Sequence, residues 1–179
     1  DLIDFTTASH GIGSGLPAPY AMFDGRLSNM FLDYAYRDLS IEANRRLFII
    51  AEGKPADWAT LMALSPIMGF KMEEASTAHI NDGTGGNMTP NGTLATADRG
   101  ANQDNCVASE FDGSTDYLTT ASVGATDSNV FVLSLDAKTL TSNARTFEFY
   151  DTSTGYFIFN IMVRPDGFAL TCKSSTNTS

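Results

Sequence analysis

Glu110 and Asp112 are the first residues to weigh for catalysis. They alternate around Phe111 in a run typical of a β-strand, so their side chains would lie on one face of it. Two neighbouring carboxylates, one acting as nucleophile and one as acid and base, perform retaining glycoside hydrolysis. Gly113 ends the run, however, and Glu148 stands alone in another. We therefore predict that these acids are solvent-facing strand residues and that the protein is not an enzyme.

The sequence contains no signature of an activated nucleophile or of a nucleotide-binding loop. His10 and His79 are the two histidines, and no Gly-x-Ser-x-Gly turn accompanies them. The glycine-rich stretch 11–15 is not a dinucleotide fingerprint, because Pro17 and Pro19 stand where its helix would begin. We predict no catalytic residue and no organic cofactor.

Charge and cysteine content argue against further classes of site and partner. The chain of 179 residues has a formal net charge of −10, and its basic residues are scattered apart from Arg45 and Arg46. Nucleic acid requires a cationic face, so we expect no such partner. No apolar run approaches membrane-spanning length, so we expect no membrane insertion. Cys106 and Cys172 lack zinc-site spacing and are predicted to be buried thiols, with a single disulfide between them as the alternative.

Short apolar runs separated by glycine, asparagine, aspartate, serine or proline predict an all-β protein. The Asp-Gly pair at 24–25 predicts a turn between two strands. One short helix is expected near 40–49, followed by a linker at 51–67 that includes one helical turn at most. The expected strands are 1–7, 20–25, 27–36, 69–72, 93–97, 106–112, 116–120, 129–137, 145–150, 156–163 and 167–172.

Two stretches resemble parts of concanavalin A-like, laminin G-like jelly-roll modules. The segment 20–36 followed by Leu39-Ser-Ile-Glu42 is similar to the closing part, where an aromatic-x-Gly strand and a last outer strand precede a helix beginning Leu-Ser-x-Glu. The loop 81–87, the strand Asn91-Gly-Thr93 and the strand Phe111-Asp-Gly-Ser-Thr-Asp-Tyr117 resemble the opening part. In this chain, the ending precedes the beginning.

The resemblance implies a concanavalin A-like antiparallel β-sandwich, or jelly roll, and two ways of dividing the chain. Residues 1–50 would supply the last strands and closing helix of one module, 51–67 a linker, and 68–179 the first part of a second module. Alternatively, both parts close on each other as one circularly permuted sandwich. The stretch 38–55 is also similar to segments between such modules in tail, fibre or particle proteins of bacteriophages.

Calcium is the cofactor that the resemblance suggests, because many relatives hold it with aspartate and carbonyl oxygens at the sandwich edge. The candidate ligands here are Asp82, Asp112 and Asp116, with Asn81 beside the first. The competing interpretation is structural, since aspartate and asparagine beside glycine form turns by bonding their own main chain. Catalytic relatives carry a Glu-x-Asp-x-x-Glu strand, and that strand is absent here.

The function implied by the resemblance is a non-catalytic, extracellular virion protein whose loops or concave face bind a host-surface glycan. Its expected partners are other virion subunits, including copies of itself. The alternative is a purely structural role in decorating or assembling a phage particle, and a polysaccharide hydrolase is a remote third hypothesis. Tyr34, Tyr36, Tyr117 and Tyr156 have rings that could stack on a sugar, although aromatic residues are also favoured in strands generally.

Overall fold

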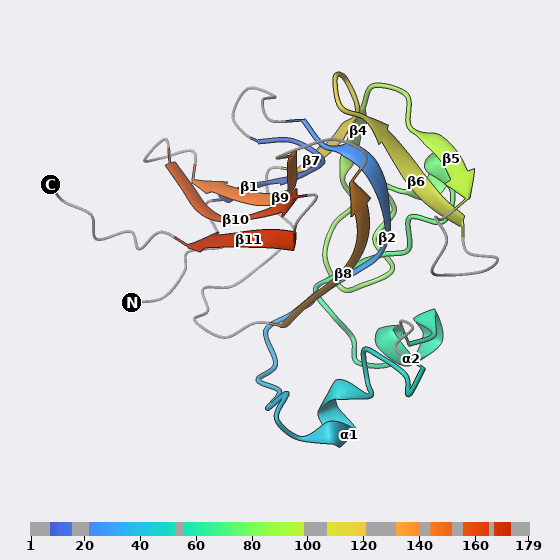
Figure 1. The fold of residues 1–179 in the computed structure, drawn as a ribbon, viewed down its shortest axis with the longest axis vertical. Coiled ribbons are helices and arrows are strands. Elements are labelled where there is room, and N and C mark those ends of the chain that lie inside the picture. Colours follow the sequence, from blue (N-terminus) through green and yellow to red (C-terminus); the bar gives the residue numbers. More distant parts are fainter. Residues whose placement is uncertain are drawn as a thin grey trace, which may run out of the picture.

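The computed structural model describes residues 8–15, 22–52, 56–98, 107–120, 132–139, 144–151, 156–164 and 167–172. Within them the chain forms two antiparallel β-sheets, two short α-helices and the 3₁₀ helix η1 (Ala75–Thr77) (Figure 1). The prediction of an all-β sandwich is confirmed, while the specific jelly-roll arrangement stays a prediction.

The first sheet holds the N-terminal strand at its centre. Its strands, in spatial order, are β11 (Gly167–Cys172), β10 (Tyr156–Arg164), β9 (Ala144–Asp151), β1 (Ala8–Ile12), β7 (Tyr117–Thr120) and β4 (Thr89–Asn91). Ile12 of β1 lies opposite Phe147 of β9 on one side and Leu118 of β7 on the other. All three side chains are buried in one core, so β1 is held by pairing on both edges and by packing.

The second sheet is organised around its longest described strand. Its strands are β2 (Asp24–Asp33), β3 (Met68–Phe70), β5 (Ala95–Asp98), β6 (Val107–Asp112) and β8 (Val132–Thr139). Strand β2 pairs with β8 along one edge and with β6 and β3 along the other. The register shifts between Ser28 and Phe31, where Asn29 has a positive φ of 52° and donates its backbone N–H to the Lys71 carbonyl at 2.9 Å.

The core lies between the sheets and follows the period of two that strands impose. In β2, Met30 and Leu32 face this core, together with Phe70 of β3 and Phe111 of β6. The first sheet contributes Phe147, whose ring meets that of Phe149 edge to face at 4.7 Å. Aromatic residues thus fill the space between the layers.

Strands from the first fifty residues pair with strands from the later part of the chain in both sheets. Strand β1 lies between β7 and β9, and β2 contacts β6 and β8 along most of its length. Strand pairing therefore crosses the proposed division at residues 50 and 68. The number of modules stays a prediction.

The described residues of the segment 34–67, between β2 and β3, form a unit that we call the helical lobe. It contains α1 (Glu42–Arg45) and α2 (Trp58–Met62), both beyond the ends of β2 and β8 (Figure 1). A small second core joins the lobe to the sheet, because Phe31 projects from the other face of β2 and meets Phe48 edge to face at 5.4 Å. The Asp57 carboxylate caps α2 by accepting the Thr60 N–H at 3.0 Å.

Several sequence predictions are wrong near these elements. The pair Asp24-Gly25 is not a turn but the start of β2, where Gly25 is paired on both sides. The strand predicted to reach residue 36 ends at Asp33. The expected helix is shorter than predicted, because α1 has no side-chain cap at Ile41 and buries no residue. The segment 51–67, expected to be a linker with one helical turn at most, contains that turn as α2, and Leu61 of α2 is buried in the second core.

Local residue types also gave no sign of two strands, β1 at Ala8–Ile12 and β4 at Thr89–Asn91. The glycine-rich stretch after His10 reads as a loop, yet Gly11 and Ile12 belong to β1 because strands on both sides bind their backbone. Strand β4 contains Pro90, which an edge strand tolerates because one side of its backbone needs no ladder. The predicted strand 1–7, Cys106 and the side chain of Cys172 lie outside the described residues.

His10 is a polar residue on the core side of β1. It is fully buried, and its ring contacts Phe149 edge to face at 4.4 Å. Neither ring nitrogen has a hydrogen-bond partner among the described residues. Desolvation by burial therefore lowers the pKa of His10 from its ordinary 6.5 to about 3.

We expect His10 to make the fold sensitive to acid. The unfolded chain binds a proton at this residue below pH 6.5, whereas the folded chain keeps it neutral down to about pH 3. Stability from this group is therefore complete above pH 6.5 and falls by about 1.4 kcal/mol per pH unit as the pH drops toward 3. In urea unfolding at several pH values, His10→Leu should flatten this dependence. Equal slopes for the two proteins would contradict the prediction.

Candidate functional site

The turn between β6 and β7 is organised by Asp112. Its carboxylate accepts the backbone N–H groups of Thr115 at 2.7 Å, Ser114 at 2.8 Å and Asp116 at 3.0 Å. It also accepts the hydroxyls of Ser114 and Thr115 at 2.7 and 2.8 Å. Desolvation raises the pKa of Asp112, but the hydrogen bonds from Thr115, Ser114 and Asp116 outweigh it and hold that pKa well below its usual range.

Asp116 joins this turn to the segment before β5. It is buried, and its Oδ1 accepts the Thr93 N–H at 2.7 Å. Gly92, with a positive φ of 76°, lies so close that a β-carbon there would stand 2.2 Å from the same oxygen. A left-handed glycine is therefore required for the two loops to meet.

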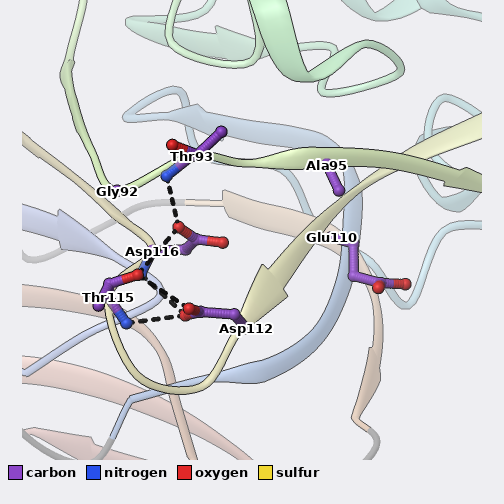
Figure 2. A pocket seen from close by; sticks show the side chains of 7 residues that line it. All are labelled: Gly92, Thr93, Ala95, Glu110, Asp112, Thr115 and Asp116. Carbon is purple, nitrogen blue, oxygen red and sulfur yellow. Dashed lines mark hydrogen bonds between the residues drawn. The ribbon is translucent and has the colours of Figure 1, made fainter.

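These two loops border an open pocket of about 240 Å³ beside strands β5 and β6 (Figure 2). Its lining is polar and acidic, and consists of Gly92, Thr93, Ala95, Glu110, Asp112, Thr115 and Asp116. The structure thus brings Glu110 and Asp112 to one pocket, as their strand spacing predicts. No aromatic ring and no histidine is among the lining residues, so the pocket offers mainly hydrogen-bond acceptors.

The acidic residues weighed for catalysis are in different environments. Glu110 pairs with Arg26 at 2.7 Å, and Arg26 also donates to the carbonyl of Asp98. Glu148, expected to face solvent, is instead fully buried in β9, opposite Gly11 and Asn160 of the neighbouring strands. The prediction of exposure was wrong for Glu148 because strand alternation does not reveal what covers the outer face of a sheet.

Asp82 lies in a different loop from Asp112 and Asp116. Its Oδ2 accepts the indole N–H of Trp58 at 2.8 Å, which ties the helical lobe to the loop after η1. The neighbouring Asn81 Oδ1 accepts the backbone N–H groups of Gly69 and Gly83. These contacts are those of turn-forming residues.

The three candidate calcium ligands are not brought together as one set. Asp112 and Asp116 share the β6–β7 turn, while Asp82 bonds to the lobe. Among the described residues, no three carboxylate, imidazole or thiol side chains gather closely enough to hold a metal ion. The donor set therefore does not fit a calcium ion coordinated by all three, and calcium binding stays a prediction.

A second candidate surface lies on the helical lobe. Among the described residues, six large hydrophobic side chains are exposed, and five of them lie between residues 36 and 50. These five are 38% to 76% exposed: Tyr36, Leu39, Ile41, Ile49 and Ile50. The sixth, Ile80, lies outside the lobe. Scattered exposed apolar residues are common, but five within residues 36–50 make this segment a candidate interaction surface.

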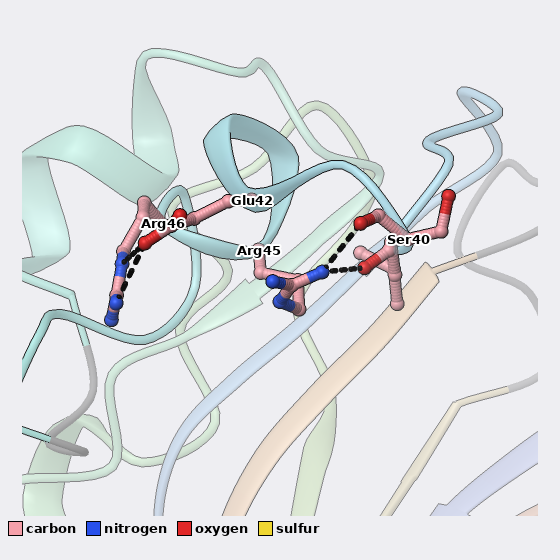
Figure 3. Close-up of polar contacts among 5 residues, drawn as sticks. Ser40, Glu42, Arg45 and Arg46 are labelled. Atoms are coloured by element: carbon pink, nitrogen blue, oxygen red, sulfur yellow. Dashed lines mark hydrogen bonds and ion pairs between the residues drawn. The ribbon is translucent and has the colours of Figure 1, made fainter.

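Polar contacts hold this segment in shape while leaving its apolar groups outside. Arg45 donates to the carbonyls of Leu39 and Ser40, both at 2.7 Å. Arg46 pairs with Glu42 across one turn of α1 at 2.9 Å (Figure 3). The side chains of α1 are therefore fixed by hydrogen bonds and an ion pair rather than by burial.

Sequence reasoning missed this surface. The residue pattern predicts a strand that reaches Tyr36, a closing helix near 40–49 and a linker after it, so it assigns these apolar residues to regular elements. A recognisable signal was present, because Ile49 and Ile50 follow Phe48 directly and fit neither one helix face nor strand alternation. Of the tyrosines weighed for sugar stacking, Tyr36 is 76% exposed, Tyr34 and Tyr117 are half-buried, and the Tyr156 side chain lies outside the description.

Comparison with known proteins gives no family for the chain. No family model, no curated protein and no solved structure matches it. Within the described residues, no helix has the length and apolar character needed to cross a membrane.

We expect Asp112→Ala to destabilise the fold by about 1–2 kcal/mol, because five donors of the turn lose their acceptor. Chemical unfolding measures the change. Asp98→Ala is the matched control, since the backbone carbonyl of this exposed residue, rather than its carboxylate, accepts from Arg26. Equal effects of the two substitutions would show that the turn does not depend on Asp112.

Proposed function

We propose that this chain is a non-catalytic β-sandwich subunit of a larger particle and that it packs against a neighbouring protein through its helical lobe. The observation that carries the proposal is the concentration of exposed apolar side chains in residues 36–50. Covering a large aliphatic side chain that water otherwise surrounds is worth about 1.5–3 kcal/mol, so several together provide a useful driving force for association.

The charge distribution supports the same face. Residues 34–67 contain four basic and four acidic residues, so the helical lobe is formally neutral. The rest of the chain carries the entire net charge of −10. A protein neighbour that approaches the lobe therefore meets exposed apolar side chains and no net charge, whereas other faces of an acidic protein repel most acidic partners.

The particle that we propose is a virion, because the sequence resembles modules of bacteriophage tail, fibre or particle proteins. An extracellular location on such a particle suits a protein that carries an acidic sandwich. We also propose one permuted sandwich rather than two partial modules, since β1 and β2 pair with later strands in both sheets. A hydrolase has less support, because Arg26 engages Glu110 and the turn engages Asp112.

Site-specific photo-cross-linking in the native assembly tests the docking face. A photoreactive amino acid at Ile41 or Ile49 should form a cross-link to protein, and mass spectrometry identifies both ends. The matched control is the same group at Ile80, which is exposed to a similar degree but lies outside the lobe. Cross-links from Ile80 alone, or from none of the positions, would remove the proposed function.

Host-surface glycan recognition is a second candidate, and the pocket beside β5 and β6 favours it. Its Glu110 carboxylate and Thr93 hydroxyl can accept hydrogen bonds from sugar hydroxyls. This candidate predicts binding on a glycan array that Glu110→Ala weakens several-fold. Glu73→Ala removes another ion-paired glutamate, the partner of Lys71, and should have no effect. If the unmodified protein binds no glycan on the array, glycan recognition is ruled out and packing against a neighbouring protein is the remaining candidate.

A further inference from the structure

We infer that the neighbour on the helical lobe is a second copy of this chain, related by a two-fold axis that passes between Glu42 and Arg46. The inference rests on the proposed function and adds the identity and the arrangement of the partner. A two-fold contact is self-complementary, because each residue meets the counterpart of its own partner. The surface of the lobe must therefore match itself when α1 is turned end over end.

The charges of α1 have this property. Glu42 and Arg46 lie one turn apart on the same face of α1, and their side chains are 67% and 45% exposed. When two copies of α1 lie antiparallel, Glu42 of each copy faces Arg46 of the other. The contact within one copy, at 2.9 Å, can thus be joined by two contacts of the same kind between copies.

Exposed apolar residues flank α1 on both sides along the chain. Leu39 precedes the helix and Ile49 follows it, and both are exposed. Ile41 and Ile50 extend the apolar surface on the two sides. A two-fold axis brings the apolar residues before α1 in one copy against those after α1 in the other. A foreign partner would need this order independently, whereas a second copy already has it.

Burial and net charge point to the same arrangement. Helix α1 has four residues and buries none of them, and so short a helix gains little stability by itself. A copy packed across it would provide the missing burial. Because the lobe is neutral, contact between two lobes keeps the acidic remainders of the two chains apart.

Sedimentation velocity of the purified chain over a range of concentrations tests the partner. We expect a dimer that dissociates on dilution. Ile41→Asp and Ile49→Asp should weaken it at least ten-fold, and Ile80→Asp should not. A chain that stays monomeric at all concentrations would overturn the inference. The proposed function would survive that result if Ile41 still cross-links to a different protein in the native assembly, and would fall with it if no cross-link forms.

Charge exchange tests the two-fold arrangement. Glu42→Arg alone and Arg46→Glu alone should each be monomeric, because like charges face each other across the axis. An equimolar mixture of the two variants should form a dimer, and so should the double variant with both substitutions, which restores every opposite pair. Both single variants lose the same ion pair within one copy, so each controls for the other. Failure of the mixture to associate would overturn the arrangement.

Discussion

The alternation of apolar side chains along β2 is the constraint on which the rest of the structure depends. Met30 and Leu32 enter the core between the sheets, while Phe31 enters the second core beneath the helical lobe. One strand therefore connects two apolar clusters, and Phe31 is the one described strand residue of the second cluster. A shift of its register by one position would expose Met30 and Leu32 and place Phe31 in the wrong layer.

The same strand shows how the register is fixed. At Asn29 the backbone has a positive φ, and its N–H leaves the ladder to bond with Lys71. This irregularity coincides with the register shift against β8, and it separates the part of β2 that pairs with β6 from the part that pairs with β3. Because β2 is bound along both edges, its end at Asp33 fixes where the helical lobe begins relative to the sheet.

The two candidate surfaces differ in how their polar groups are used. In the β6–β7 turn, the carboxylates of Asp112 and Asp116 are engaged by backbone N–H groups, so they stabilise loops before they are available to any ligand. On the lobe, hydrogen bonds and the ion pair of Glu42 with Arg46 hold α1, and the apolar side chains remain outside. The carboxylates of the first surface therefore act mainly as turn-forming residues. The second surface has exposed apolar side chains that a partner could cover.

The strands after residue 106 were predictable to within a few residues, and β11 to the residue, because alternating apolar runs and turn-forming residues are local signals. The sequence by itself also determined the acidic charge, the all-β character and the placement of Glu110 and Asp112 on one side of a strand, next to a turn. Only the tertiary structure decided that β1 is a central strand, that Glu148 is buried and that residues 36–50 stay exposed. Each of these depends on which distant segments pair with or cover a residue, and no local pattern specifies that.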